Sequence, residues 1–268
     1  MARRSKLAQK KHNIAIAMMV AAVITMIAIG GAIAYLYMGR DEPVDSVTLC
    51  PAPGPEGHTV LLVDNTDPMN FIQRQAMTQR LKEAADKLVP EGHMVSVFVL
   101  GESFTDNAMP IFEKCNPGTG EGKNSLNSNP KRIKKRFVDE FQGPLVRLRD
   151  QVVLDTPSDR SPIFEMLHLL SINGFSRIDA QGPRTLIIFS DMLQHMPEFS
   201  MFKALPEFKA FRESTYGRKS QARLEGVEVH LNYLLNHPKL QTNKQASFWE
   251  QYFDNSGAHL VSVKAFEG

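Results

Sequence analysis

The chain has 268 residues, with 31 Lys and Arg against 29 Asp and Glu, and two cysteines. Five of the 31 basic residues lie within the first 13 positions, so the remainder has a net charge of about −3 with histidine neutral. A mildly acidic remainder argues against nucleic acid as a partner. Two cysteines are too few for a zinc cluster. The length allows one large domain or two small ones.

The amino-terminal segment predicts a membrane anchor. Residues 14–38 contain no charged side chain, and this run is longer than the roughly 20 residues that a helix needs to cross a bilayer. The basic tail, residues 1–13, favours a cytoplasmic amino terminus by the positive-inside rule, which exports everything after residue 38. The chain has no Asn-x-Ser/Thr glycosylation site, which fits a bacterial envelope. The expected location is the inner membrane, with a periplasmic carboxyl-terminal domain.

A cleaved signal peptide is the alternative interpretation of this segment, because Ala32-Ile33-Ala34 resembles a small-residue cleavage site. The apolar part of a signal peptide spans about 7–15 residues, and the longer run here favours an uncleaved anchor. Within the run, Gly30-x-x-x-Ala34 is a spacing that permits close packing of membrane helices. Homo-oligomerisation through this helix is therefore a further expectation.

Residues 39–57 are rich in proline and glycine, which predicts a short, fairly stiff linker between the membrane and the domain. Cys50 lies in this linker and Cys115 in the domain that follows. An even number of cysteines in an oxidising compartment suggests one disulfide. The sequence does not show that the two residues meet, so two free thiols are the alternative.

Beyond the linker, apolar runs alternate with segments of helical periodicity. Asp67 and Pro68 are expected to open the first helix, and Gly143-Pro144 to kink the second. The alternation predicts one α/β domain, residues 58–268, with a Rossmann-like, mainly parallel sheet flanked by helices. Strands are expected at 58–63, 94–100, 185–189, 226–235 and 258–263, helices at 69–88, 131–151, 163–172 and 248–254, and a long exposed loop at 101–130.

Two of the expected strands end in aspartate. The first runs into Asp64-Asn65-Thr66-Asp67, and the strand at 185–189 runs into Ser190-Asp191. In an open α/β sheet, ligands bind in the crevice beyond the carboxyl ends of the strands. Carboxylate and hydroxyl oxygens are the ligands that hard cations such as Mg²⁺ prefer. The pattern therefore indicates a cation site at this edge.

These residues resemble the metal-ion-dependent adhesion site of von Willebrand factor type A domains, over about residues 58–265. The resemblance implies the fold of that family and a bound Mg²⁺ or Mn²⁺ whose open position takes a carboxylate of a protein partner. Pro68 stands where the family has a second serine, and the neighbouring Asp67 is the substitute oxygen donor, so the site is degenerate. The implied ligands are Asp64, Thr66, Ser161 (in Arg160-Ser161-Pro162) and Asp191, with Asp67.

A phosphohydrolase of the haloacid-dehalogenase type is the alternative from another class. In that interpretation Asp64 is the nucleophile and Ser190 contacts the phosphate, but Thr66 occupies the position of the usual second acid. The histidines, including His237, show no spacing typical of metal ligands. The favoured expectation is a non-enzymatic protein-binding module in a membrane complex.

A metal-free scaffold subunit is the remaining alternative. Its docking surface would be the Met- and Phe-rich segment 192–211 or the loop 101–130.

Overall fold

The structure is a computed structural model that describes residues 2–38, 43–125, 128–148 and 157–267. Residues 39–42 of the expected linker and 149–151 of the expected second helix lie outside the described residues. The chain divides into two compact units. One comprises Met1–Glu42 with Gly120–Arg132, and the other Pro43–Thr119 with Ile133–Gly268.

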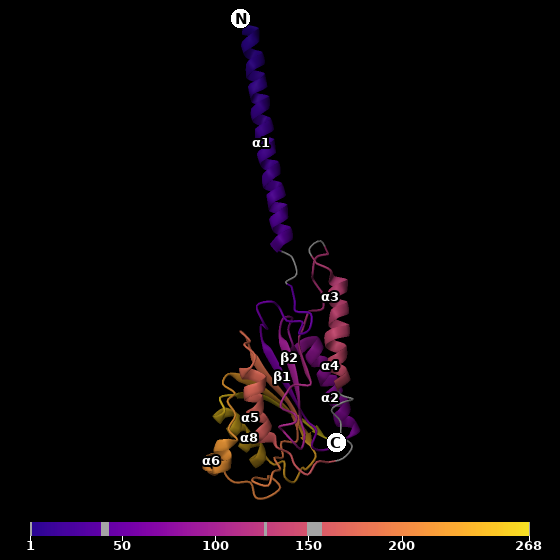
Figure 1. Cartoon of the computed structure of the whole chain (residues 1–268), viewed down its shortest axis with the longest axis vertical. Coiled ribbons are helices and arrows are strands. Elements are labelled where there is room, and N and C mark those ends of the chain that lie inside the picture. The colour runs from indigo at the N-terminus through magenta and orange to yellow at the C-terminus, as the bar shows by residue number, and fades with distance from the viewer. Residues whose placement is uncertain (1, 39–42, 126–127, 149–156, 268) are drawn as a thin grey trace. The chain divides into compact units, whose positions relative to one another are not determined.

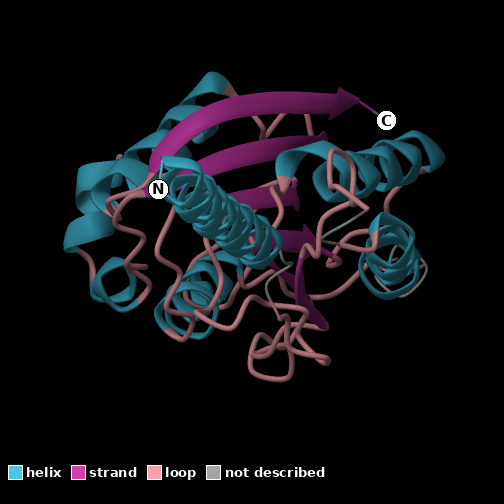
Figure 2. Cartoon of the chain, turned by 90° about the horizontal axis from the view of Figure 1, so that it is seen from above, coloured by secondary structure: helices cyan, strands magenta, loops and turns pink. Residues whose placement is uncertain are grey.

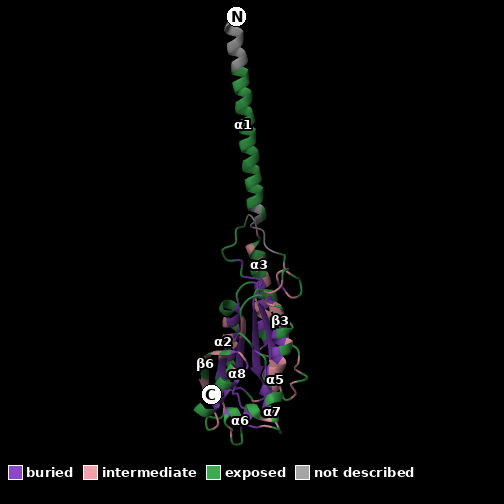
Figure 3. Cartoon of the chain, turned by 90° about the vertical axis from the view of Figure 1, so that its left-hand side faces the viewer, coloured by how far each residue is buried: buried purple, intermediate pink, exposed green. Residues whose placement is uncertain are grey.

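The first unit contains a single long helix, α1 (Ala2–Met38). Its Lys10–Tyr35 stretch is long and apolar enough to cross a membrane, judged by length and composition, and no other helix among the described residues meets this criterion. Apolar side chains along α1 are exposed (Figure 3). The hydroxyl of Thr25 donates to the carbonyl of Ala21 at 2.8 Å, so this polar group is satisfied within the helix itself.

The second unit is built on a six-stranded sheet in the order β3-β2-β1-β4-β5-β6 (Figure 2). Neighbouring strands are parallel except for β3, which pairs antiparallel to β2 at one edge. The order and directions are those of a Rossmann-like sheet with one antiparallel edge strand, which confirms the expected fold class. The strands are β1 (His58–Asp64), β2 (Met94–Leu100), β3 (Phe112–Cys115), β4 (Arg184–Ser190), β5 (Val227–Leu235) and β6 (His259–Glu267).

Helices cover both faces of this sheet, α2 and α4 on one side and α5 and α8 on the other (Figure 1). Successive side chains of a strand point to opposite faces, so Leu61 of β1 packs toward α2 and Leu62 toward α5. Both faces are therefore apolar. The helices are α2 (Phe71–Glu83), α3 (Pro130–Arg136), α4 (Gly143–Arg147), α5 (Ile163–Leu169), α6 (Phe208–Glu213), α7 (Thr215–Lys219) and α8 (Asn243–Asn255), with π-helical turns at Ala84–Leu88, Phe137–Gln142 and Leu170–Ser176.

Two local expectations were wrong. Helix α2 is capped by Asn70, whose side chain accepts from the Gln73 amide, so neither Asp67 nor Pro68 opens it. The expected loop 101–130 contains β3, which is only four residues long and half polar. At Gly143, where a kink was expected, the helix changes type, from the π-helical turn Phe137–Gln142 to α4, in which Pro144 has no N–H to donate.

The Met- and Phe-rich segment 192–211 contributes mainly to the core. Met192, Met201, Phe208 and Phe211 are each at most 8% exposed, whereas Phe202 is 43% exposed. The ring of Phe164 from α5 lies between this segment and α8, stacked on Phe211 and on Trp249. Most of the apolar surface that a metal-free docking mode needs is therefore already buried within the domain.

The segment immediately before β1 is packed against the sheet. Leu49 is 1% exposed, and Cys50 is joined to Cys115 at the end of β3 by a disulfide. The amide of Cys115 also donates to the carbonyl of Thr48 at 2.7 Å. Residues 43–57 are thus tied by covalent and hydrogen bonds to the edge of the domain.

Candidate metal centre

The carboxyl ends of the parallel strands bring together side chains from three loops. Asp64 ends β1 and Asp67 lies in the loop that follows it, the chain after β4 carries Asp191, and the chain after β5 carries His237. The pairing of Val63 with Phe189 aligns the ends of β1 and β4, so Asp64 and Ser190 leave the sheet side by side. The site is therefore where open α/β sheets place their ligands.

Asp64 forms a closed hydrogen-bond network beneath this surface. Its Oδ1 accepts from the Thr66 amide at 3.0 Å and from the Thr66 hydroxyl at 2.6 Å, and its Oδ2 accepts from the Ser190 hydroxyl at 2.6 Å. The Thr66 hydroxyl is also 3.0 Å from the hydroxyl of Ser161. Burial raises the pKa of Asp64, and the hydrogen bonds from Ser190 and Thr66 oppose that shift.

Asp191 is buried next to this network but is only partly satisfied. One carboxylate oxygen, Oδ1, accepts from the Leu193 amide at 2.9 Å. Among the described residues, the other oxygen, Oδ2, has no hydrogen-bond partner, although the residue is only 3% exposed. Burial raises the pKa of Asp191 well above its usual value, and the negative charge of Asp64 adds to the shift. A buried carboxylate in this condition favours a proton or a cation at its open oxygen.

Asp67 and His237 lie at the same place as Asp191. One ligand atom from each of these three residues lies within 4.8 Å of the other two, with Asp191 buried, Asp67 half-buried and His237 exposed. Two carboxylates and an imidazole at these distances can hold a divalent cation. The exposed side of the group faces solvent, which gives access to a partner.

The side chain of Gln241 fixes the position of the His237 loop. Its Nε2 donates to the carbonyls of Leu234 and Asp191, at 2.7 and 3.1 Å, while its Oε1 accepts from the His237 amide at 2.8 Å. The buried side chain of Gln73 on α2 donates to Asn236 at 2.8 Å. The loops after β4 and β5 are thus tied to each other and to the start of α2.

The five predicted oxygen donors fall into two neighbouring groups. Asp64, Thr66 and Ser161 are joined by hydrogen bonds, whereas Asp191 lies with Asp67. Sequence reasoning did not select His237, because it follows β5 and has no recognisable spacing from the acids. Ser190 was considered only as a phosphate contact, and in the structure it donates to Asp64.

Exposed apolar side chains lie close to this group in the chain. Phe71 and Ile72, in the first turn of α2, are 72% and 57% exposed. The ring of Phe202 packs against those of His237 and His195, with centroids 5.3 and 5.1 Å apart. Acidic ligands are thus accompanied by apolar side chains of the kind that anchor protein partners.

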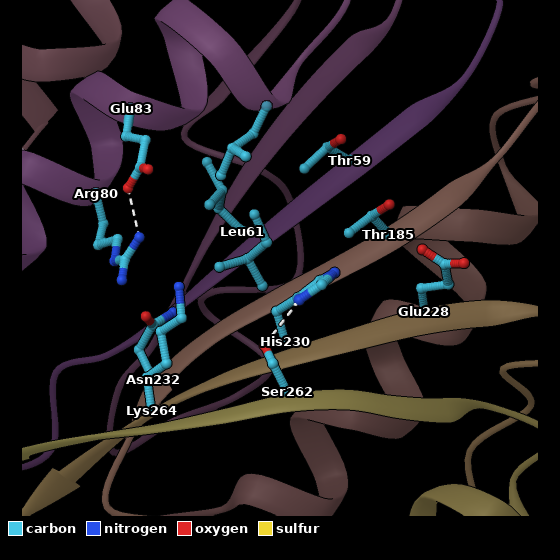
Figure 4. A pocket seen from close by; sticks show the side chains of 12 residues that line it. Thr59, Leu61, Arg80, Glu83, Thr185, Glu228, His230, Asn232, Ser262 and Lys264 are labelled. Atoms are coloured by element: carbon cyan, nitrogen blue, oxygen red, sulfur yellow. Dashed lines mark hydrogen bonds and ion pairs between the residues drawn. The ribbon is translucent and has the colours of Figure 1, made fainter.

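A separate groove of about 480 Å³ lies on the face of the sheet that carries α2 (Figure 4). Its floor is polar at β5 and β6, where His230 is 2.9 Å from the hydroxyl of Ser262, and Arg80 pairs with Glu83 at its margin. None of Asp64, Asp67, Asp191 and His237 lines it. The groove and the candidate metal centre are therefore different features.

No protein-family profile matches the chain, and no curated protein sequence does. Among solved structures, an aerotolerance-related membrane protein from Bacteroides fragilis is similar at 8% identity and a TM-score of 0.35, over 78% of this chain and 90% of that one. Manganese-loaded TRAP protein of Plasmodium vivax is similar at 13% identity and a TM-score of 0.33, over 66% and 57%. The pilus adhesin SpaC of Lactobacillus rhamnosus GG is similar at 12% identity and 0.33, over 81% and 30%.

Structural similarities with TM-scores this low do not indicate the function of the chain. The fold follows from the sheet itself, from its strand order, its single antiparallel edge strand and the helices on both faces. The chain has a Rossmann-like α/β fold with a mainly parallel sheet between two layers of helices.

Proposed function

We propose that the chain is a membrane-anchored, non-enzymatic protein-binding module of the cell envelope whose partner docks at the carboxyl edge of the sheet through a divalent cation. The observation that carries the proposal is the convergence of Asp67, Asp191 and His237, with an unsatisfied buried oxygen on Asp191 and an exposed side. The ion that the sequence resemblance implies is Mg²⁺ or Mn²⁺, both of which accept carboxylate and hydroxyl oxygens and leave positions for other ligands.

The surroundings of the site favour a protein as the partner. Exposed Phe71 and Ile72 offer apolar contact area within a few residues of Asp67. A carboxylate from the partner would complete the coordination of the cation, and the apolar side chains would supply burial around it. This is the bridging mechanism that the sequence resemblance implies.

The environment of Asp64 argues against the phosphohydrolase alternative. A carboxylate nucleophile must be ionised and must reach the phosphorus atom. Asp64 is 5% exposed, both of its oxygens accept hydrogen bonds, and burial favours its protonated form. These properties suit a structural support for the site better than a nucleophile.

Membrane anchoring and orientation complete the proposal. Residues 1–13 form a cytoplasmic tail, and residues 14–38 cross the inner membrane. The linker, residues 39–57, is held against the domain over residues 43–57 and leads into residues 58–268, the binding domain in the periplasm. The length and composition of Lys10–Tyr35 support the anchor, and the Cys50–Cys115 disulfide supports an oxidising compartment. The small residues of the helix support homo-oligomerisation as a further property.

A capture experiment with the full-length chain tests this function. The tagged chain is expected to capture a membrane partner from solubilised, cross-linked membranes when Mn²⁺ is present, and to lose it in EDTA. Asp191→Asn should lose the same partner in Mn²⁺, because the amide removes a charged ligand at little change in shape. Asp254→Asn, an exposed substitution on α8, should retain it.

Two results would contradict the proposal in different ways. Equal capture with Mn²⁺ and EDTA by all three proteins would favour the metal-free scaffold. Turnover of a phosphate ester by the wild-type chain, lost in Asp64→Asn, would favour the enzyme.

A further inference from the structure

We infer that the ion at the carboxyl edge is a transition-metal dication bound directly by Asp67, Asp191 and His237, while Asp64, Thr66 and Ser161 support it without touching it. This inference rests on the proposed function, since it specifies the ligands and the class of metal of the same site. Both the ligands and the class of metal differ from those that the sequence resemblance implies.

The hydrogen bonds of Asp64 argue that it is not a direct ligand. Its two carboxylate oxygens already accept three hydrogen bonds, from the Thr66 amide, the Thr66 hydroxyl and the Ser190 hydroxyl. These bonds occupy three of the about four lone-pair sites of the carboxylate. Asp64 is also not one of the residues whose ligand atoms converge within 4.8 Å, which are Asp67, Asp191 and His237.

Asp191 differs from Asp64 because one of its carboxylate oxygens accepts no hydrogen bond from any residue that the structure describes. Its Oδ2 is buried and has no hydrogen-bond partner among the described residues. One ligand atom of Asp191 and one each of Asp67 and His237 lie within 4.8 Å of one another. A buried acceptor without a partner, beside a second carboxylate and an imidazole, favours a cation at this position.

His237 is held at this position by specific contacts. Gln241 accepts from the amide of His237 and donates to the carbonyl of Asp191, which connects the backbones of two ligands through one side chain. The Phe202 ring packs against the imidazole in a T-shaped arrangement, with the ring planes at 77°. Contacts that orient a ligand strengthen metal binding even though they do not touch the ion.

The imidazole determines the class of metal. Mg²⁺ takes oxygen ligands almost exclusively and keeps several waters. A nitrogen ligand favours the later first-row dications. The affinity of a given nitrogen and oxygen site rises from Mn²⁺ through Fe²⁺, Co²⁺ and Ni²⁺ to Cu²⁺, and falls again at Zn²⁺. Two carboxylates and one imidazole also match sites with three protein ligands and a position left for another group. The inferred ion is therefore Zn²⁺ or a neighbouring transition metal, with Mn²⁺ weaker and Mg²⁺ weakest.

Isothermal titration calorimetry on the full-length chain in detergent, with Zn²⁺, Mn²⁺ and Mg²⁺ in separate titrations, tests this assignment. We expect Zn²⁺ to bind on the order of tenfold or more tighter than Mg²⁺. His237→Gln should weaken Zn²⁺ binding by a similar factor and leave any Mg²⁺ binding unchanged. The matched control is His259→Gln, an exposed histidine on β6, which should bind Zn²⁺ like the wild type.

The Ser161→Ala variant distinguishes the ligands inferred here from the ligands that the sequence resemblance implies. Ser161 is a ligand in the arrangement implied by the resemblance and lies outside the set inferred here, so its loss should change the Zn²⁺ affinity by less than about threefold. The backbone bonds between Ser161 and His195 do not involve the hydroxyl and persist in the variant. The fluorescence of Trp249, the single tryptophan, reports whether each variant is folded.

Different results would contradict the ligand assignment and the proposed cation-dependent function. If Mg²⁺ binds as tightly as Zn²⁺, and Ser161→Ala but not His237→Gln weakens it, the ligand assignment is wrong and the proposed cation-dependent function stands. If no dication binds the folded wild-type chain, both proposals fail.

Discussion

Removal of the Cys50–Cys115 disulfide should lower the free energy of unfolding by about 4 kcal/mol, the largest single effect that we expect from a local change. The two cysteines are 65 residues apart in the chain. Cross-linking a loop of this length restricts the unfolded chain strongly, because the loop must be closed in every unfolded conformation. Cys115 is fully buried and Cys50 is 7% exposed, so serine at either position would also place a hydroxyl in an apolar environment.

Urea unfolding of the full-length chain in detergent, followed by Trp249 fluorescence, measures this effect. The Cys50→Ser, Cys115→Ser double variant and the reduced wild type should unfold at similar, much lower urea concentrations than the oxidised wild type. Reductant should have no effect on the double variant, which serves as the control. An unchanged midpoint for the reduced wild type would contradict the predicted stabilisation.

The stability of the chain should also depend on a buried histidine at the other end of β1. His58 is 1% exposed, its Nε2 lies 2.8 Å from the Ser96 hydroxyl, and its Nδ1 has no partner among the described residues. Burial lowers the pKa of His58 to about 4 from the ordinary 6.5, and the positive charges of Arg177 and Arg184 contribute to this shift. Between these two pKa values, His58 is therefore protonated in the unfolded chain and neutral in the folded protein.

The direction of the pH dependence follows from this difference. Above pH 6.5 neither state is protonated at His58, and the contribution to stability is complete. As the pH falls from 6.5 toward 4, the unfolded chain gains a proton that the folded chain does not, and roughly 2 to 3 kcal/mol of stability is lost by pH 4.5. Asp64 and Asp191, with raised pKa values, act in the opposite direction, so the effect must be measured as a difference between two proteins.

The comparison is between the wild type and His58→Gln, unfolded in urea at several pH values between 7.5 and 4.5. The stability advantage of the wild type over His58→Gln should shrink by roughly 2 to 3 kcal/mol over this range. A constant difference between wild type and His58→Gln would mean that His58 is protonated alike in the folded and unfolded chains.

The strands could be predicted from sequence because their signal is local. A buried parallel strand is a continuous apolar run, and β1, β2 and β4 are mainly such runs. Strand β5 instead alternates apolar and polar residues before its apolar end, which is also a local strand signal. Strand β3 has only two apolar residues, and its existence depends on pairing with β2 and on the disulfide at its end. The Asn70-x-x-Gln73 capping box was a local signal that could have placed the start of α2 correctly.

The acids of the candidate site were predictable for the same reason, since Asp64, Asp67 and Asp191 all lie at or within a few residues of the end of an apolar run. His237 was not, because its place beside Asp191 depends on the length of β5 and on the bridge made by Gln241. The hydrogen bond from Ser190 to Asp64 likewise joins residues 126 positions apart. Which oxygens are satisfied and which one is open is a property of the folded arrangement, and the sequence contains no sign of it.

The most direct test of the central claim is a calorimetric titration of the purified full-length chain with Mn²⁺, an ion that both proposed ligand sets accept. The wild type and Asp254→Asn should bind Mn²⁺ with a stoichiometry of one per chain, and Asp191→Asn should bind it on the order of tenfold or more weakly. Mn²⁺ binding of equal strength in Asp191→Asn, or none in the folded wild type, would contradict a cation site at the carboxyl edge of the sheet.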